Sequence, residues 1–215
     1  MPEGNDIHEF YRDIKGIEGR TIKSTGQKVL RVFPKGKVIF VDLSGGQTIV
    51  MRFGMTGYVT LSREPPRYTK KTVVFTQGDP LHWVSVRKLG SYKVVRTSRA
   101  RQIEDSLGPD PLMRPTWVIR MRLDRRSGTL GRMLMDQAFI SGIGNRLRAQ
   151  ILWEARLNPH RKLSDLTPHE KDVLATKIYE VMKYRPYADD VYRNPKARRD
   201  MMDGRVMWWF PDRQK

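Results

Sequence analysis

The first residues after the initiator methionine carry the groups best suited to covalent chemistry. A small residue at position 2 permits removal of Met1, which would leave Pro2 as a free secondary amine. An N-terminal amine is partly neutral near pH 7, so it can attack a sugar aldehyde and form an iminium. Glu3 adds a carboxylate that can move protons during such a reaction. The pair predicts nucleophilic catalysis, although many chains begin Met-Pro by chance.

A second group of residues is suited to holding a phosphate. Gly142 and Gly144 interrupt a helical stretch, and Asn145 follows as the expected cap of the next helix. Such a helix start presents backbone N–H groups and a positive dipole end, and Arg146 and Arg148 add charge. From these residues alone, a phosphate-binding turn and an ordinary helical hairpin fit equally well.

The composition favours a polyanionic partner. The 215 residues include 41 Lys and Arg against 23 Asp and Glu, a formal net charge of +18 at pH 7. The arginines are spread from Arg12 to Arg213, so the folded surface itself should be basic and nucleic acid is the leading partner. A ribosomal or non-specifically basic protein is the alternative.

The chain has no cysteine and only four histidines, which excludes disulfides, a thiol nucleophile and a cysteine zinc site. We expect no metal and no organic cofactor, because the chemistry of an amine and carboxylates needs neither. No apolar run reaches the length of a membrane span, and the N-terminus lacks a signal peptide's apolar core. We expect a monomer in the cytoplasm, nucleoid or nucleus, neither secreted nor bound to a membrane.

The N-terminal half predicts a small helix and a sandwich of strands. Residues 5–16 form an amphipathic pattern whose apolar face contains Ile7, Phe10, Tyr11 and Ile14. From there to about residue 95, short β-prone runs separated by turn signals predict an antiparallel β-sandwich. The expected strands are 29–32, 38–41, 48–51, 58–61, 72–75, 82–85 and 91–94.

The C-terminal half is predicted to be helical. Glycine and prolines at 107–111 mark the junction, and apolar stripes at 133–139 and 147–155 indicate helices. Thr167 should cap a helix that begins at Pro168, with Glu170 completing a capping box. The last 25 residues return to short extended pieces. We therefore expect three parts, at 1–106, 107–190 and 191–215.

The string from Met135 to Arg148 resembles the helix–two-turns–helix motif of the Fpg/Nei family, the formamidopyrimidine-DNA glycosylases and endonuclease VIII-like enzymes. Members of this family begin Pro-Glu, as this chain does without Met1. The resemblance implies an α+β fold. Its parts are an N-terminal antiparallel β-sandwich with an edge helix, a helical helix–two-turns–helix domain, and a β-hairpin finger.

The resemblance implies a bifunctional DNA glycosylase and abasic-site (AP) lyase that excises oxidised bases. Pro2 would attack C1′ and expel the base, and Glu3 would handle protons at the sugar. Strand cleavage would follow by β-elimination or β,δ-elimination. The family carries a lysine after a turn, for which Lys37 is the candidate and Lys35 the fallback. Without the resemblance, Lys37 would count as an ordinary solvated lysine.

The resemblance also assigns side chains to the gap that a flipped base leaves. Met55, in Gly54-Met55-Thr56-Gly57, matches the family's wedge turn. In Arg87-Lys88-Leu89-Gly90, Arg87 would face the orphaned base and Leu89 would replace an aromatic wedge. The alternative for Met55 and Leu89 is chance, or packing beneath a loop.

Most family members end in a four-cysteine zinc finger, and here Phe210 and Arg213 stand at cysteine positions. The resemblance therefore implies a zinc-less finger in which an aromatic cluster replaces the metal. Arg205 would grip the phosphates beside the lesion and assist the second elimination. Gly144, Asn145 and Arg146 would contact the DNA backbone. The alternative is a degenerate tail in which Arg205 has no special role.

The chain departs from the family at Asn5-Asp6, where a Pro-Glu pair is usual, and Asp6 is a candidate substitute for the second Glu. The lesion-recognition loop at about 185–200 should be short. A second hypothesis is therefore a non-catalytic sensor of damaged or abasic DNA, and a third is an RNA-associated protein. The sequence leaves open whether the DNA partner is double-stranded or single-stranded, and whether an oxidised purine or pyrimidine is preferred.

Overall fold

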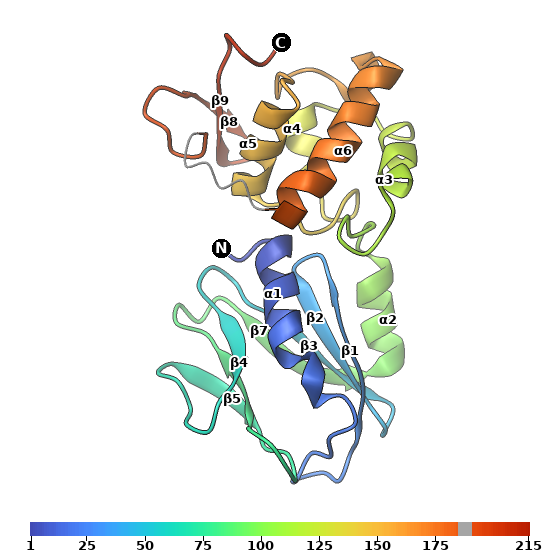
Figure 1. The fold of residues 1–215 in the computed structure, drawn as a ribbon, viewed down its shortest axis with the longest axis vertical. Helices are drawn as coiled ribbons and strands as arrows, with labels where there is room; N and C mark the ends of the chain where they lie inside the picture. The colour runs from blue at the N-terminus through green and yellow to red at the C-terminus, as the bar shows by residue number, and fades with distance from the viewer. Residues whose placement is uncertain (185–190) are drawn as a thin grey trace. The chain divides into compact units, whose positions relative to one another are not determined.

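A computed structural model describes residues 1–184 and 191–215 (Figure 1). The chain divides into two compact units, Met1–Ser106 and Leu107–Lys215. Residues 191–215 thus belong to the same compact unit as the helices. None of the described helices has an apolar stretch long enough to cross a membrane.

The first unit contains two antiparallel sheets, as the strand pattern predicts. A four-stranded sheet has the order β1-β2-β3-β7, with β1 Val29–Lys35, β2 Val38–Leu43, β3 Gln47–Arg52 and β7 Ser91–Arg96. A three-stranded sheet has the order β4-β6-β5, with β4 Tyr58–Leu61, β6 Leu81–Val84 and β5 Thr69–Val73.

The N-terminal helix closes one side of this sandwich. Helix α1 spans Gly4–Ile14 and continues into a short 3-10 turn, Lys15–Ile17. It contacts β1 and β4, the edge strands of the two sheets, and also β2. Ile7 and Ile14 are fully buried in the shared core, and Phe10 packs against it. The predicted edge helix and its apolar face are confirmed.

Strand β5 begins earlier than the sequence predicts. The predicted strand at 72–75 is wrong in its bounds, because Phe75 leaves the sheet and pairs through a single bridge with Ile22. Phe75 is buried at that position. Only Phe75 of this run is buried, since Thr72 and Val74 are exposed, so the pattern of apolar residues did not locate a buried strand.

Helix α2, Thr97–Asp105, has no counterpart among the predicted elements. It buries only Ala100, so it lacks an apolar periodicity that the sequence could reveal. The ion pair between Arg101 and Asp42 on β2 joins this helix to the sheet, and Arg101 also pairs with Glu104 within the helix. The Arg101 guanidinium also lies 5.2 Å from the centre of the Phe33 ring.

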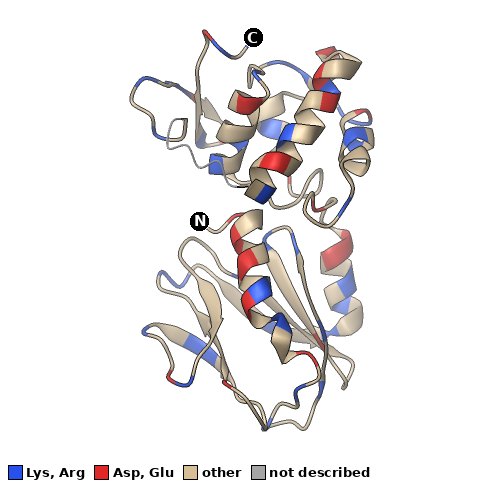
Figure 2. Ribbon diagram, in the orientation of Figure 1, with Lys and Arg blue, Asp and Glu red and all other residues tan. Residues whose placement is uncertain are grey.

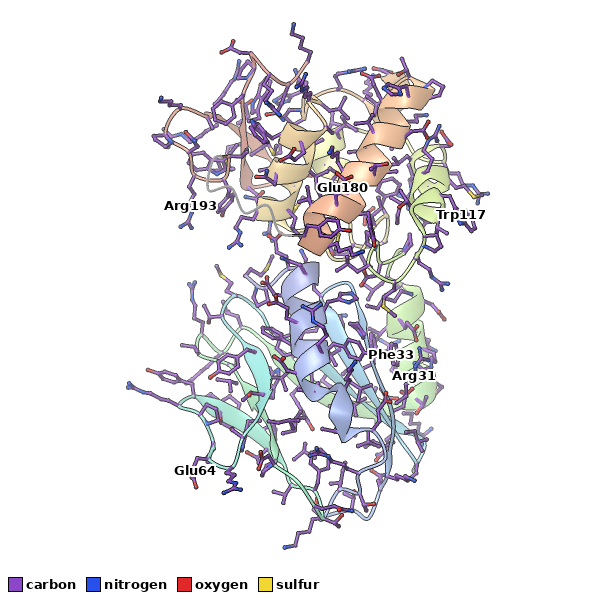
Figure 3. All side chains as sticks on the ribbon, viewed as in Figure 1. Arg31, Phe33, Glu64, Trp117, Glu180 and Arg193 are labelled. Carbon is purple, nitrogen blue, oxygen red and sulfur yellow. The ribbon has the colours of Figure 1, made fainter. Side chains whose placement is uncertain are left out.

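Phe33 is covered from two sides on the outer face of the four-stranded sheet. It stacks on Phe40 with ring centres 5.0 Å apart. The Arg31 guanidinium lies 4.2 Å from the Phe33 ring centre, and Figure 3 shows the two side chains beside each other. Cation–π contacts of this kind let a basic surface cover aromatic rings.

The second unit is helical with a terminal hairpin. Its elements are α3 Thr116–Leu123, α4 Leu130–Met133, α5 Asn145–Glu154, α6 Pro168–Tyr184, β8 Arg198–Met202 and β9 Arg205–Trp209. The capping box of α6 is confirmed, since the Glu170 amide donates to Thr167 Oγ1 and the Thr167 amide donates to Glu170 Oε2. Apolar residues of the helices and of β9 share one core.

The expected helix over 133–139 is wrong, because α4 ends at Met133. Tight turns replace it, with the Phe139 and Ile140 amides both donating to the Asp136 carbonyl oxygen. The Asp136 carboxylate also accepts from the Ala138 amide. Short polar side chains that bond the local backbone in this way compete with helix formation. The apolar stripe is buried all the same, with Phe139 fully inaccessible.

Candidate functional site

The candidate nucleophile directly precedes the start of a well-capped helix. Glu3 is the N-cap of α1, and its amide donates to Asp6 Oδ2 over 2.8 Å. The Glu3 carboxylate in turn accepts from the Asp6 amide, which completes a capping box. The backbone next to Pro2 is therefore fixed by the helix. Asp6, the candidate second carboxylate, contributes to this cap.

The two candidate lysines flank the tight turn between β1 and β2. Gly36 has a φ of +59°, a conformation that favours glycine. Lys35 Nζ donates to the Glu104 carbonyl oxygen over 2.7 Å, so the fallback lysine secures the C-terminal turn of α2. Lys37 follows the turn and is half-buried. Figure 1 shows this turn at the same end of the unit as the start of α1.

The structure brings the three candidate wedge residues together. The turn containing Met55 lies between β3 and β4, and the loop containing Arg87 and Leu89 lies between β6 and β7. Arg87 Nη1 approaches Met55 Sδ to 3.4 Å. Met55 is 42% exposed and Leu89 58% exposed. Neither apolar tip is therefore packed beneath a loop.

Glycines make this close approach possible. A Cβ on Gly54 would lie 2.6 Å from the Leu89 carbonyl carbon, and Gly54 has a φ of +62°. A Cβ on Gly90 would lie 2.7 Å from both the Arg52 carbonyl oxygen and the Trp83 ring. The two loops thus pack backbone against backbone, which fixes the separation of the exposed tips.

The start of α5 differs from the sequence prediction in one respect. Asn145 is the first residue of α5, and Gly144 is the N-cap, with φ −116° and ψ −170°. The prediction that Asn145 caps the helix is therefore wrong. Its side chain makes tertiary contacts instead: Nδ2 donates to the Val206 carbonyl oxygen over 2.9 Å, and Oδ1 accepts from Arg148.

The two arginines beside this turn have different positions. Arg146 is exposed, as expected of a residue that binds phosphate. Arg148 is completely buried and donates to the Gly131 carbonyl oxygen over 2.8 Å. The expectation that Arg148 adds to the phosphate-binding surface is wrong. It bridges α4 to Asn145 and so orients the Asn145 amide.

Gln137 shapes the turns before α5, and the sequence reasoning did not single it out. Its side-chain nitrogen donates to the carbonyl oxygens of Met135 and Ile143, and its Oε1 accepts from the Gly142 amide. One side chain thus satisfies three backbone groups of the two turns. The position of Gln137 within the helix–two-turns–helix motif is the feature of the sequence that could have pointed to this role.

The β8–β9 hairpin is fastened to the helices by aromatic and polar contacts. Met207 and Trp209 are buried in the helical core. Asp200 accepts from Trp209 Nε1 over 2.6 Å and lies 2.8 Å from His160 Nε2. Burial would raise the pKa of Asp200, but hydrogen bonds from His160, Trp209 and Arg198 outweigh it and lower that pKa.

The two residues at the expected cysteine positions also hold this region. The Arg213 guanidinium stacks 3.8 Å from the centre of the Trp153 ring, and Nε donates to the Trp153 carbonyl oxygen. The Phe210 amide donates to Gln214 Oε1 over 2.8 Å. The segment is thus ordered against α5, contrary to a degenerate tail. Arg205 begins β9 and is exposed.

Positive charge is present throughout both units (Figure 2). Several cations form ion pairs that serve the fold, such as Arg132 with Asp203 beside the hairpin turn, at 2.6 Å. Arg87, Arg146 and Arg205 are exposed at the candidate positions. Because these three side chains are exposed, they can contact phosphates without any change in the packing of the core.

The first unit has two sheets and begins with a capped helix, and the second has a helix–two-turns–helix motif and a terminal hairpin. These two units together are typical of a class of DNA-repair proteins. The formamidopyrimidine-DNA glycosylase N-terminal domain matches residues 23–92, and the H2TH domain of formamidopyrimidine-DNA glycosylase matches residues 107–185. The chain belongs to the Fpg/Nei family of DNA glycosylases.

Similar curated proteins are named formamidopyrimidine-DNA glycosylase. That of Pelotomaculum thermopropionicum is 29% identical, over 83% of this chain and 65% of its own length. That of Cereibacter sphaeroides is 30% identical, over 74% of this chain and 61% of its own length. The chain therefore spans about two thirds of the length of these relatives.

Solved structures share the fold. The MutM (Fpg) protein of Thermus thermophilus superimposes with a TM-score of 0.81 at 24% identity, over 99% of this chain and 98% of that one. The Lactococcus lactis protein, solved with DNA containing an AP site, gives a TM-score of 0.80 at 18% identity, over 99% of each chain. The predicted α+β fold with its terminal hairpin is confirmed.

Proposed function

We propose that this protein is a DNA glycosylase of base excision repair that removes oxidised bases and then cleaves the strand as an AP lyase. The observation that carries the proposal is the fixed pair of turns presenting Met55, Arg87 and Leu89. Exposed apolar tips beside an arginine suit a duplex from which a nucleotide has been flipped, since the tips can occupy the gap and reduce the cost of unstacking.

Pro2 and Glu3 supply the chemistry. With Met1 removed, the Pro2 nitrogen attacks C1′, the base leaves, and an iminium joins Pro2 to the opened sugar. Loss of a C2′ proton then expels the 3′ phosphate, and water releases Pro2 from the remaining sugar fragment. Glu3 moves protons at the sugar, and the Lys37 cation offsets negative charge that develops as the base leaves.

Gly144, Asn145, Arg146 and Arg205 hold the DNA backbone. The amides at the start of α5 and the exposed guanidinium of Arg146 suit a phosphate. The Asn145–Val206 hydrogen bond supports this assignment, because it fastens the strand bearing Arg205 to the α5 N-terminus. Proteins of similar structure have been solved with DNA containing an AP site and with DNA containing carbocyclic 8-oxo-G, so DNAs with an abasic site or with 8-oxoguanine are the first to test.

Borohydride trapping tests the mechanism. The purified protein, with its N-terminus verified by mass spectrometry, is incubated with duplex DNA containing one abasic site, and borohydride is added. We expect a covalent adduct that maps to Pro2 by peptide mass spectrometry. An adduct that maps to another residue would refute the nucleophile assignment.

A non-catalytic sensor of damaged DNA is the second candidate. The position of Asp6 favours this candidate. Its carboxylate accepts a hydrogen bond from the Glu3 amide in the helix cap, and this bond competes with a second use of the carboxylate in proton transfer. Tight binding to abasic duplex without any adduct, by protein shown to lack Met1, would support the sensor over the glycosylase.

A further inference from the structure

A third segment lies at the end of the three-stranded sheet that carries the two candidate wedge loops, which are the turn with Met55 and the loop with Arg87. Tyr58 at the start of β4 and Thr69 at the start of β5 both pair with Val84, the last residue of β6. The turn before β4 carries Met55, and the loop after β6 carries Arg87. The segment before β5 therefore emerges at the same sheet end, one strand spacing of roughly 4.8 Å from β6.

This third segment is Arg67-Tyr68, and its backbone is held in a rare conformation. Tyr68 has a φ of +68°, which is unusual for a bulky residue and carries strain. Its carbonyl oxygen accepts from the Ser85 amide over 3.2 Å, at the start of the loop that bears Arg87. On its other side, Thr69 Oγ1 donates to the Pro66 carbonyl oxygen over 2.6 Å. The strained residue is thus anchored to the wedge loop.

The anchored backbone presents an aromatic ring and a cation to solvent. Tyr68 is 44% exposed, and the Arg67 guanidinium lies 4.8 Å from its ring centre. No ion pair joins Arg67 to an acidic side chain within residues 1–184 and 191–215. The strand that follows adds Lys70 and Lys71, both exposed. An exposed ring with surrounding positive charge is the combination that binds single-stranded nucleic acid.

We propose that Arg67 and Tyr68 form a stacking platform for an unpaired DNA base, so that this protein binds DNA that is single-stranded or opened beside the lesion. The inference rests on the proposed function, since it extends the same DNA contact by one loop. The Tyr68 ring covers the face of the base, and the Arg67 guanidinium meets the adjacent phosphate. Stacking on a ring reads no base identity, so we expect little sequence preference.

The test uses oligonucleotides in which 2-aminopurine replaces one base, either in single-stranded DNA or unpaired beside an abasic site. Fluorescence anisotropy gives the affinity, and quenching of 2-aminopurine reports stacking directly. Tyr68→Ala should weaken binding to these DNAs roughly tenfold to a hundredfold and abolish the quenching. It should change binding to a fully paired abasic duplex much less.

Tyr68→Phe keeps the ring and should keep both affinity and quenching. Trp117→Ala is the matched control, because Trp117 is an exposed ring, 63% accessible, on α3 of the other unit (Figure 3). It should leave both readouts unchanged. Arg67→Gln should weaken binding and retain part of the quenching.

Unchanged quenching and affinity in folded Tyr68→Ala, with wild-type protein that binds and is trapped on abasic DNA, would overturn this inference alone. Equal losses in Tyr68→Ala and Trp117→Ala would also overturn it. Wild-type protein that neither binds nor is trapped on abasic duplex would instead refute the proposed function. Thermal melting of each variant establishes that the folded proteins are compared.

Discussion

Asn145 donates a hydrogen bond to the carbonyl oxygen of Val206, and this contact joins the first turn of α5 to the strand that carries Arg205. The same side chain accepts from the buried guanidinium of Arg148. One amide thus fixes the spacing between two elements proposed to bind the DNA backbone. Its orientation is set from inside the core, because Arg148 also bonds the Gly131 carbonyl oxygen.

Asn145→Ala should therefore weaken DNA binding and lower stability together. The change leaves buried Arg148 short of one acceptor and frees the hairpin strand, which we expect to lower the free energy of unfolding by about 1–3 kcal/mol. Affinity for abasic duplex should fall at least tenfold. Urea unfolding and fluorescence anisotropy measure the two effects. Arg146→Gln should also lower affinity, because it removes an exposed positive charge beside the same helix start. Unchanged stability in Asn145→Ala would contradict the bridging role.

Gly54→Ala should separate the two wedge loops. A Cβ at this position would lie 2.6 Å from the Leu89 carbonyl carbon, in addition to the cost of a left-handed φ. Gly46→Ala is a matched control, since Gly46 has a φ of +68° and nothing within 4 Å of its Cβ position. We expect about 1 kcal/mol of destabilisation for Gly46→Ala and clearly more for Gly54→Ala. Thermal unfolding measures both, and equal losses would show that the loops can separate without strain.

Lys37→Met and Lys35→Met should affect different properties. Lys35 bonds the last turn of α2, so its replacement should lower the free energy of unfolding by about 1 kcal/mol and keep trapping by the folded protein. Lys37→Met should lower excision of an oxidised base at least tenfold at an equal folded fraction. Single-turnover excision and urea titration test the pair. The opposite pattern would reverse the choice between the two lysines.

The Arg161–Glu170 pair predicts a stability difference that depends on pH. Bidentate hydrogen bonds from Arg161, at 2.6 and 3.1 Å, lower the pKa of Glu170 to about 2 from 4.5. A lowered folded-state pKa contributes stability that is complete above pH 4.5 and is lost as pH falls towards 2. Both side chains are partly exposed, so we expect only about 1 kcal/mol.

Glu170→Gln isolates this ion pair, because an amide oxygen can still accept from the Thr167 amide and maintain the capping box. The difference from wild type, measured by urea unfolding, should be constant from pH 7 to 5 and shrink below pH 4.5. Glu170→Ala loses the cap as well and should remain less stable than Glu170→Gln at every pH. A wild-type advantage that persists at pH 2 would contradict the assignment.

Local patterns were sufficient wherever one residue and its near neighbours decide the structure. The alternation of apolar residues predicted the two-sheet unit, and Thr167, Pro168 and Glu170 marked the start of α6 because a capping box involves only four consecutive residues. Met55 and Arg87 could be predicted as wedge residues from the short sequence motifs of their turns. That they meet depends on the backbone contact between Gly54 and Leu89, which lie 35 residues apart.

Elements held by distant partners could not be predicted in the same way. Helix α2 has almost no apolar face and depends on the bonds from Arg101 to Asp42 and from Lys35 to Glu104. The string around Asn145 suggested a cap, yet its amide found a carbonyl 61 residues away. Arg148 looked like surface charge, but its guanidinium had carbonyl and amide oxygens available in the core.

The sequence by itself determined which groups this protein can use: the Glu3 carboxylate, a Pro2 nitrogen that becomes an amine when Met1 is removed, a basic chain without cysteine, and the turn motifs of its family. Only the tertiary structure decided which side chains reach solvent and which become internal supports. The physical reason is that burial and hydrogen-bond partners come from segments far apart in the chain. Tyr68 is an example, because its left-handed backbone bonds the Ser85 amide, which follows a neighbouring strand, while its side chain is exposed.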